Sequence, residues 1–68
     1  MNKNTKIYIA GHRGMVGSAI WRVLTSRGYN NLIGKTSEEL DLRNQKAVTN
    51  FFDKEKPSVV IDAAARVG

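Results

Sequence analysis

The chain has 68 residues, and eleven lysines and arginines against six aspartates and glutamates give it a formal charge of +5. It has no cysteine and one histidine, which excludes disulfides and both thiolate and histidine-rich metal sites. No apolar run approaches the roughly 20 residues that span a bilayer, and the N-terminus lacks the pattern of a signal peptide. We therefore expect a cytoplasmic protein with no membrane partner. A basic chain favours phosphate-bearing partners, but the scattered basic residues, without interleaved aromatics, argue against nucleic acid.

Five segments with short connections follow one another along the chain. Residues 6–10 form a β-branched and aromatic run that is typical of a strand buried on both faces. From residue 15 to about residue 27, apolar side chains at helical spacing predict an amphipathic helix that ends before Gly28. Trp21 lies off the apolar stripe of this helix, which consists of Val16, Ala19, Ile20, Val23 and Leu24.

The second half of the chain predicts a strand, a helix and a strand. Residues 31–35 are a weaker strand candidate, and Thr36 and Glu39 after it have the spacing of a capping box. A second helix is expected at about residues 45–55, with Asn44 as its N-cap and Pro57 just beyond its end. Residues 58–64 are rich in β-branched residues and predict the third strand.

The alternation of strands and helices predicts an α/β fold, the first half (βαβαβ) of a Rossmann-type doubly wound parallel sheet. If the strands lie in the order 3-2-1, right-handed crossovers place both helices on one face of the sheet. The other face and the free edge of the first strand would then be bare apolar surface. We therefore expect residues 1–68 to be the N-terminal part of an NAD(P)-binding Rossmann domain. The remainder of that domain and a substrate domain would belong to a longer enzyme.

Three glycines stand three residues apart between the first strand and the first helix. In this context glycines predict a nucleotide-binding loop: Gly11 for the sharp turn, Gly14 for close approach of a pyrophosphate, and Gly17 for close packing of the helix on the sheet. The alternative is a tight turn without a ligand. The predicted cofactor-binding loop consists of Gly11, His12, Arg13, Gly14, Met15, Val16 and Gly17.

The end of the second strand indicates which dinucleotide the loop would bind. Folds that prefer NAD usually carry an acidic residue there, which bonds the ribose 2′-hydroxyl. This chain has Lys35 and hydroxyl groups instead, and its first carboxylates come at Glu38 and Glu39. Arg13 offers a second cation and a bidentate fork. We therefore predict NADP, held by Arg13, Lys35 and the Ser37 hydroxyl, although Lys35 alone would be an ordinary solvated lysine.

The wording of the loop, "IAGHRGMVGSAI", carries a resemblance that is more specific than the glycines. It resembles the glycine-rich loop of GDP-L-fucose synthases, which are NADPH-dependent epimerase-reductases of the extended short-chain dehydrogenase/reductase family. The segments "ELDL" and "AAARVG" are also similar, so the resemblance covers almost the whole chain. In that family the arginine at the position of Arg13 contacts the 2′-phosphate. A second arginine is common where this chain has Ser37.

The resemblance also implies further cofactor contacts. It places Asp41 and Leu42 beside the adenine, where the alternative is a helix-entry aspartate and a core leucine. It places Ala63, Ala64 and Ala65 along the cofactor site, where the alternative is tight helix–sheet packing. No catalytic residue is carried over, because the family's serine and Tyr-x-x-x-Lys motif have no counterpart in these 68 residues.

The resemblance implies a function for the longer enzyme. It would convert GDP-4-keto-6-deoxy-D-mannose to GDP-L-fucose by 3,5-epimerisation and NADPH-dependent reduction of the 4-keto group, as a homodimer acting on a GDP-sugar. This chain would supply the adenosine and pyrophosphate half of the NADPH site and would be inactive alone. The alternatives are a fragment of another NAD(P)-dependent nucleotide-sugar epimerase or dehydratase, or a non-catalytic nucleotide-binding module.

Overall fold

Strand β1 (Ile7–Ala10) is the central strand of a three-stranded parallel sheet with the order β2-β1-β3. The structure is a computed structural model that describes residues 2–64. Helix α1 (Met15–Ser26) connects β1 to β2 (Leu32–Ile33), and helix α2 (Gln45–Glu55) connects β2 to β3 (Val59–Asp62). The predicted α/β fold and all five predicted elements are thereby confirmed. The strands are shorter than expected at one or both ends.

The ends of both helices follow the local signals in the sequence. The Asn44 side chain accepts a hydrogen bond from the Ala47 N–H at 3.1 Å, which confirms it as the N-cap of α2. Lys56, the residue before Pro57, has left-handed backbone angles that end this helix. Helix α1 ends at Ser26, and the N–H of Gly28 then donates to the Thr25 carbonyl. These signals therefore fixed both helix lengths to within a residue.

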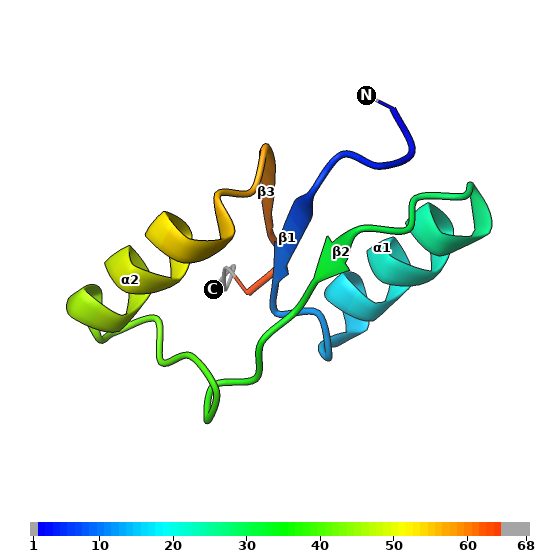
Figure 1. Cartoon of the computed structure of the whole chain (residues 1–68). Coiled ribbons are helices and arrows are strands. Elements are labelled where there is room, and N and C mark those ends of the chain that lie inside the picture. Colours follow the sequence, from blue (N-terminus) through cyan, green and yellow to red (C-terminus); the bar gives the residue numbers. More distant parts are fainter. Residues whose placement is uncertain (1, 65–68) are drawn as a thin grey trace.

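The expected strand order 3-2-1, with both helices on one face, is wrong. β3 pairs with β1, in the register Tyr8 to Val60, and β1 pairs on its other side with β2. Right-handed crossovers from β1 to β2 and from β2 to β3 therefore run in opposite directions across the sheet, which places the helices on opposite faces. Figure 1 shows α1 and α2 on either side of the sheet. The bare apolar face that the other order requires is absent from the described residues.

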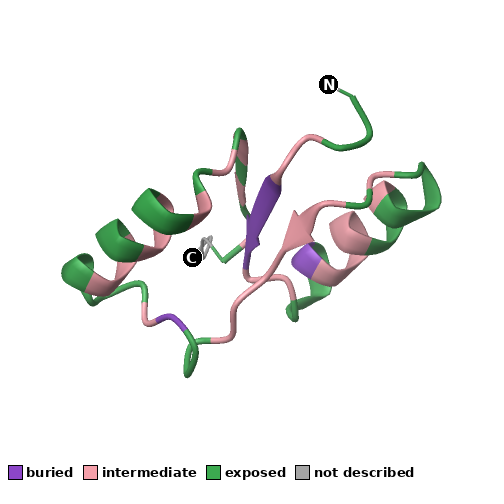
Figure 2. Ribbon diagram, in the orientation of Figure 1, coloured by how far each residue is buried: buried purple, intermediate pink, exposed green. Residues whose placement is uncertain are grey.

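Coverage on both sides explains why all four residues of β1 are buried (Figure 2). Tyr8 packs under α2, with its ring centroid 4.8 Å from that of Phe51 and 5.6 Å from that of Phe52. Leu40, which precedes α2, joins Tyr8 and Ala10 in the buried cluster. Burial on both faces is what the apolar sequence of β1 predicted.

The inward face of helix α1 is rotated from the predicted apolar stripe, of which Ala19, Ile20 and Leu24 are partly buried. Gly17 is its buried residue, whereas Val16 and Val23 are 61% and 49% exposed. Trp21, one turn beyond Gly17, is partly buried and lies with its ring centroid 5.5 Å from that of His12. The missing side chain of Gly17 lets the helix backbone approach the loop closely, and this contact decides which side of the helix faces inward.

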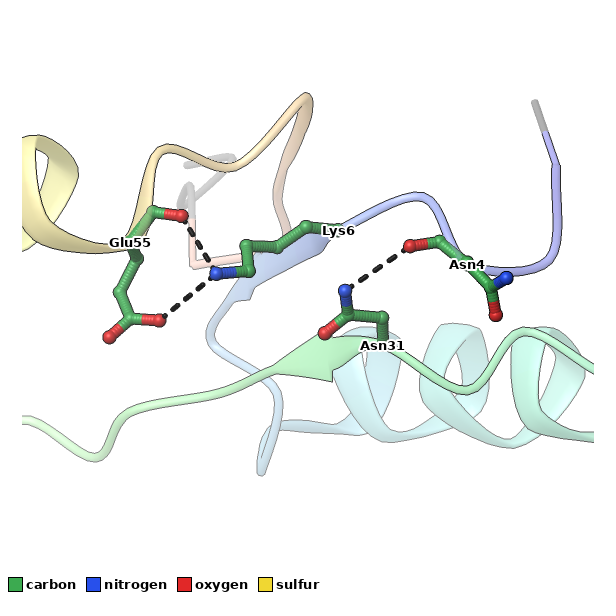
Figure 3. Close-up of polar contacts among 4 residues, drawn as sticks. All are labelled: Asn4, Lys6, Asn31 and Glu55. Atoms are coloured by element: carbon green, nitrogen blue, oxygen red, sulfur yellow. Dashed lines mark hydrogen bonds and ion pairs between the residues drawn. The ribbon is translucent and has the colours of Figure 1, made fainter.

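Polar contacts hold the helix ends to the edge of the sheet where the strands begin (Figure 3). Lys6 donates to the Glu55 carbonyl oxygen at the end of α2 at 2.9 Å and forms an ion pair with the Glu55 carboxylate at 3.4 Å. Lys3 likewise donates to the carbonyl of Arg27, the C-cap of α1. Cations at the C-terminal ends of helices interact favourably with the helix dipole. Among residues 2–64, neither helix has the length and apolar character needed to cross a membrane.

Candidate cofactor-binding site

A cavity of about 510 Å³ opens at the carboxyl edge of the sheet. Its lining includes Gly11 directly after β1, the segment that begins at Lys35 after β2, and Ala64 after β3. The volume lies in the range of small-molecule sites. Open α/β sheets bind their ligands at this edge, because loops from several strands converge there. The cavity is therefore the candidate functional site.

The turn that leaves β1 depends on two glycines of the predicted loop. Gly11 has a φ of +77°, a left-handed conformation that side chains other than glycine rarely adopt. A Cβ atom on Gly17 would lie 2.6 Å from the Gly11 carbonyl carbon and 2.9 Å from the His12 Cα atom. The sharp turn predicted at Gly11 and the close helix packing predicted at Gly17 are thus both present.

Helix α1 begins beside the cavity, and no side chain caps its first N–H groups. Gly14 lines the cavity and is the N-cap of α1, with no side chain that could accept from the first N–H groups. The first turn of the helix also contains no acidic residue. Free N–H groups and the positive end of the helix dipole favour an anion at this position. The arrangement fits a phosphate group, as the glycine spacing predicted.

Two cations and two acidic side chains line the cavity, and neither acid forms an ion pair with either cation. The cations are Arg13 and Lys35, and the acids are Glu38 and Asp41. Arg13 and Lys35 approach from the loops after β1 and β2, and neither forms an ion pair among the described residues. Asp41 is engaged by Arg43, which donates to both of its carboxylate oxygens at 3.1 and 3.2 Å. These hydrogen bonds from Arg43 hold the pKa of the Asp41 carboxyl below its ordinary value. Glu38 forms no ion pair among the described residues, so the cavity holds two unpaired cations and one unpaired carboxylate.

A reciprocal pair of hydrogen bonds shapes the segment after Lys35. The Thr36 N–H donates to the Glu39 carboxylate at 2.9 Å, and the Glu39 N–H donates to the Thr36 hydroxyl at 3.2 Å. The capping box expected there is confirmed, although it closes a turn and not a helix. Hydrogen bonds from Thr36 lower the pKa of the Glu39 carboxyl. This turn directs Thr36, Ser37 and Glu38 toward the cavity.

The structure places most of the predicted site residues around this one cavity. Leu42 is 49% exposed and lies on the cavity wall, so it is not the core leucine of the alternative interpretation, a place that Leu40 takes. Ala65 lies outside the described residues, and Met15, Val16, Gly17 and Ala63 do not line the cavity. The predicted residues that do are Gly11, His12, Arg13, Gly14, Lys35, Ser37, Asp41, Leu42 and Ala64.

Four further residues of the cavity wall were not in the predicted set: Tyr8, Thr36, Glu38 and Leu40. Thr36 and Glu38 flank Ser37, so the turn after β2 was the signal that could have found them. Tyr8 is a buried strand residue whose pattern predicted only packing. Burial, followed by the nearby Asp62 carboxylate, raises the pKa of the Tyr8 phenol, so this group stays protonated at neutral pH.

The described part of the site does not gather the side chains that a metal ion needs. Within residues 2–64, no three histidine, aspartate or glutamate side chains gather closely enough to hold a metal ion. The cavity instead combines backbone N–H donors, two cations and small residues. Groups of these kinds suit a phosphate and a flat ring, which are parts of a dinucleotide.

Comparison with curated proteins finds relatives along the whole chain. The chain is 57% identical over 67 residues to GDP-L-fucose synthase 1 of Arabidopsis thaliana, and this match covers 98% of the chain and 21% of that relative. It is 51% identical over 63 residues to GDP-L-fucose synthase of Escherichia coli K12, covering 93% of the chain and 20% of the relative. The chain thus spans about a fifth of the length of the relatives it matches.

Solved structures show the same fold at high identity. The protein titled DdhaC matches the whole chain with a TM-score of 0.94 and 62% identity, over 20% of its own length. MlghC, a GDP-mannoheptose C4 reductase from Campylobacter jejuni with NADP bound, matches 98% of the chain with a TM-score of 0.94 and 52% identity, over 21% of its length. The model of the NAD dependent epimerase/dehydratase family matches residues 7–68. This chain is therefore a member of the NAD-dependent epimerase/dehydratase family.

Proposed function

We propose that residues 1–68 form the N-terminal part of an NADP-binding Rossmann domain and hold the adenosine and pyrophosphate half of NADPH. The observation that carries the proposal is the cavity with the unpaired cations Arg13 and Lys35, beside a helix N-terminus that no acidic residue occupies. Cations in place of a carboxylate at the end of β2 suit a 2′-phosphate. NADP bound to the similar MlghC supports the same cofactor.

Each group of the site has a role in holding the cofactor. The N–H groups at the start of α1 bind the pyrophosphate, and Arg13, Lys35 and the Ser37 hydroxyl surround the 2′-phosphate. Leu42 and Ala64 offer apolar surface to the adenine and its ribose. Asp41 accepts from the adenine amino group with whatever capacity Arg43 leaves free. His12, Met15, Val16, Gly17, Ala63 and Ala65 complete the set of residues that we propose to bind or support the cofactor.

The activity that we propose for the full-length protein is conversion of GDP-4-keto-6-deoxy-D-mannose to GDP-L-fucose. This is a 3,5-epimerisation followed by reduction of the 4-keto group, in an enzyme that we expect to be a cytoplasmic homodimer. When bound, NADPH supplies the hydride for the keto carbon, and the oxygen takes a proton. The fucose synthases among the relatives support this substrate. A second candidate is a GDP-4-keto-heptose, which MlghC supports as a GDP-mannoheptose C4 reductase.

Binding by matched variants of the full-length protein tests the cofactor assignment. We expect Arg13→Ala and Lys35→Ala each to weaken NADPH binding about tenfold, because a hydrogen bond to a charged group contributes about 1.5–3 kcal/mol. NADH, which lacks the 2′-phosphate, should lose much less affinity. Arg22→Ala removes an exposed cation of α1 that does not line the cavity and serves as the control. Equal losses for both cofactors would contradict the assignment of a 2′-phosphate site.

Substrate choice needs a separate assay. The full-length protein is given NADPH with GDP-4-keto-6-deoxy-D-mannose or with a GDP-4-keto-heptose, and oxidation of the cofactor is followed by absorbance. A kcat/KM at least tenfold higher for the deoxymannose derivative supports the fucose synthase assignment. The reverse ratio would favour the heptose reductase.

A further inference from the structure

The imidazole ring of His12 lies in a space that exists because residue 34 is glycine. A Cβ atom on Gly34 would lie 2.7 Å from His12 Nδ1 and closer still to the ring carbons. The backbone of Gly34 is not left-handed, so His12, and not backbone strain, excludes a side chain there. The His12 ring also lies 5.5 Å from the ring of Trp21, between centroids. The ring therefore packs near both the residue that follows β2 and helix α1.

This contact joins the two loops that carry the unpaired cations. His12 immediately precedes Arg13, and Gly34 immediately precedes Lys35. Arg13 and Lys35 both line the cavity, yet they come from loops that follow different strands. No ion pair or side-chain hydrogen bond connects either cation to another described residue. The packing of His12 on Gly34 joins the residues that directly precede these two cations in the sequence.

We propose that His12 is a positioning residue that sets the separation of Arg13 and Lys35, and through it the preference for NADPH over NADH. The inference rests on the proposed NADP site and adds to it the element that determines specificity. Its physical basis is preorganisation, since binding groups must be held within about 0.5 Å of their productive positions. Loops that are free to separate lose part of the energy of a two-pronged contact in ordering.

The role belongs to the shape of the ring and not to its charge or hydrogen bonds. His12→Phe keeps an aromatic ring that can pack on Gly34 and Trp21, whereas His12→Ala removes it. We therefore expect His12→Phe to keep the ratio of NADPH to NADH affinity within about twofold of wild type. His12→Ala should lower this ratio about fivefold to tenfold, mainly through weaker NADPH binding.

A double substitution tests the contact itself. Gly34→Ala introduces a methyl group into the space of the ring, so it should displace His12 and lower the affinity ratio about as much as His12→Ala does. In the double variant Gly34→Ala with His12→Ala, the methyl group meets no ring. We expect the effects of the two substitutions to be far from additive, with the double variant no worse than either single variant.

The experiment measures Kd for NADPH and NADH on the full-length wild type and these four variants, with a thermal melt of each to confirm folding. If wild type does not bind NADPH, the proposed function fails and the inference with it. If wild type binds but His12→Phe loses as much NADPH affinity as His12→Ala, the imidazole itself contacts the cofactor and positioning is overturned. Additive losses in the double variant would overturn the contact between His12 and Gly34 as its cause.

Discussion

Substitution of Gly17 by alanine should separate the fold of the loop from its ligand chemistry. The nearest atom to the Cβ of the new residue would be the Gly11 carbonyl oxygen, and even the Gly11 carbonyl carbon would lie at 2.6 Å, whereas ordinary contact begins at about 3.4 Å. The start of α1 must therefore move away from the loop by at least about 0.8 Å. Because the obstacle is backbone at a turn that already has a φ of +77°, it cannot rotate away as a side chain would.

The expected loss of stability follows from two opposing terms. Overpacking typically costs about 1–3 kcal/mol, and the better helix propensity of alanine returns about 1 kcal/mol. Because the obstacle here is backbone, the upper part of that cost, about 2–3 kcal/mol, applies, and we expect a net loss of about 1–2 kcal/mol in the free energy of unfolding of the full-length protein. Urea unfolding measures it as a lower midpoint at an unchanged slope.

Gly14→Ala is the matched control, because it adds the same methyl group three residues earlier in the same loop. The nearest atom to its Cβ would be the Gly11 carbonyl oxygen at 3.4 Å, and its φ of −75° suits any residue. We expect its stability to stay within about 0.5 kcal/mol of wild type, while NADPH binding weakens. A Gly17→Ala protein as stable as wild type would refute the close-packing role of this glycine.

Two further predictions concern the segment between β2 and α2. Asn44→Ala should lower the stability of the full-length protein by about 1 kcal/mol through loss of the N-cap. Asn50→Ala, on the exposed side of α2, is the control and should not lower it. Equal effects in urea unfolding would contradict the capping role of Asn44. The pKa of the Glu39 carboxyl is lowered in the folded chain. The contribution of this group to folding stability is therefore complete above its unfolded pKa of about 4.5, and it is lost as pH falls through the lower folded pKa. An NMR titration of Glu39 should show a midpoint below 4.5. Thr36→Val removes the hydroxyl acceptor of the Glu39 N–H but leaves the Thr36 N–H donor in place, so this variant should retain part of the shift in the pKa of Glu39. A wild-type midpoint at or above 4.5 would refute the effect.

Local sequence signals predicted the elements well because each depends on a few neighbouring residues. The N-cap at Asn44, the capping box of Thr36 and Glu39, and the turn at Gly11 need only short-range geometry. The cavity wall was largely predictable for the same reason. Parallel strands place their carboxyl ends at one edge, so the loops that follow them converge wherever the strands lie in the sheet.

The strand order could not be read from the same signals, since both orders satisfy right-handed crossovers. One clue was present: residues 6–10 predicted a strand buried on both faces, and such a strand needs a helix on each side. The orientation of α1 was harder to predict, because its inward face keeps Ile20 and Leu24 of the predicted stripe but is rotated toward Gly17. The contact at Gly17 sets this rotation, and a missing side chain leaves no periodic signal.

The contacts of Lys3 and Lys6 with the ends of the two helices lie at the edge of the sheet opposite the cavity. The two helices are thus fastened at one edge of the sheet, while the candidate site lies at the other. Residues that anchor the architecture can therefore vary independently of residues that choose a ligand. During evolution, the loops after β1, β2 and β3 could change and give a new cofactor preference. The contacts that hold the helix ends to the sheet would not have to change with them. Conversely, replacing Lys6 or Glu55 should lower the folding stability of the protein and leave its choice of ligand unchanged.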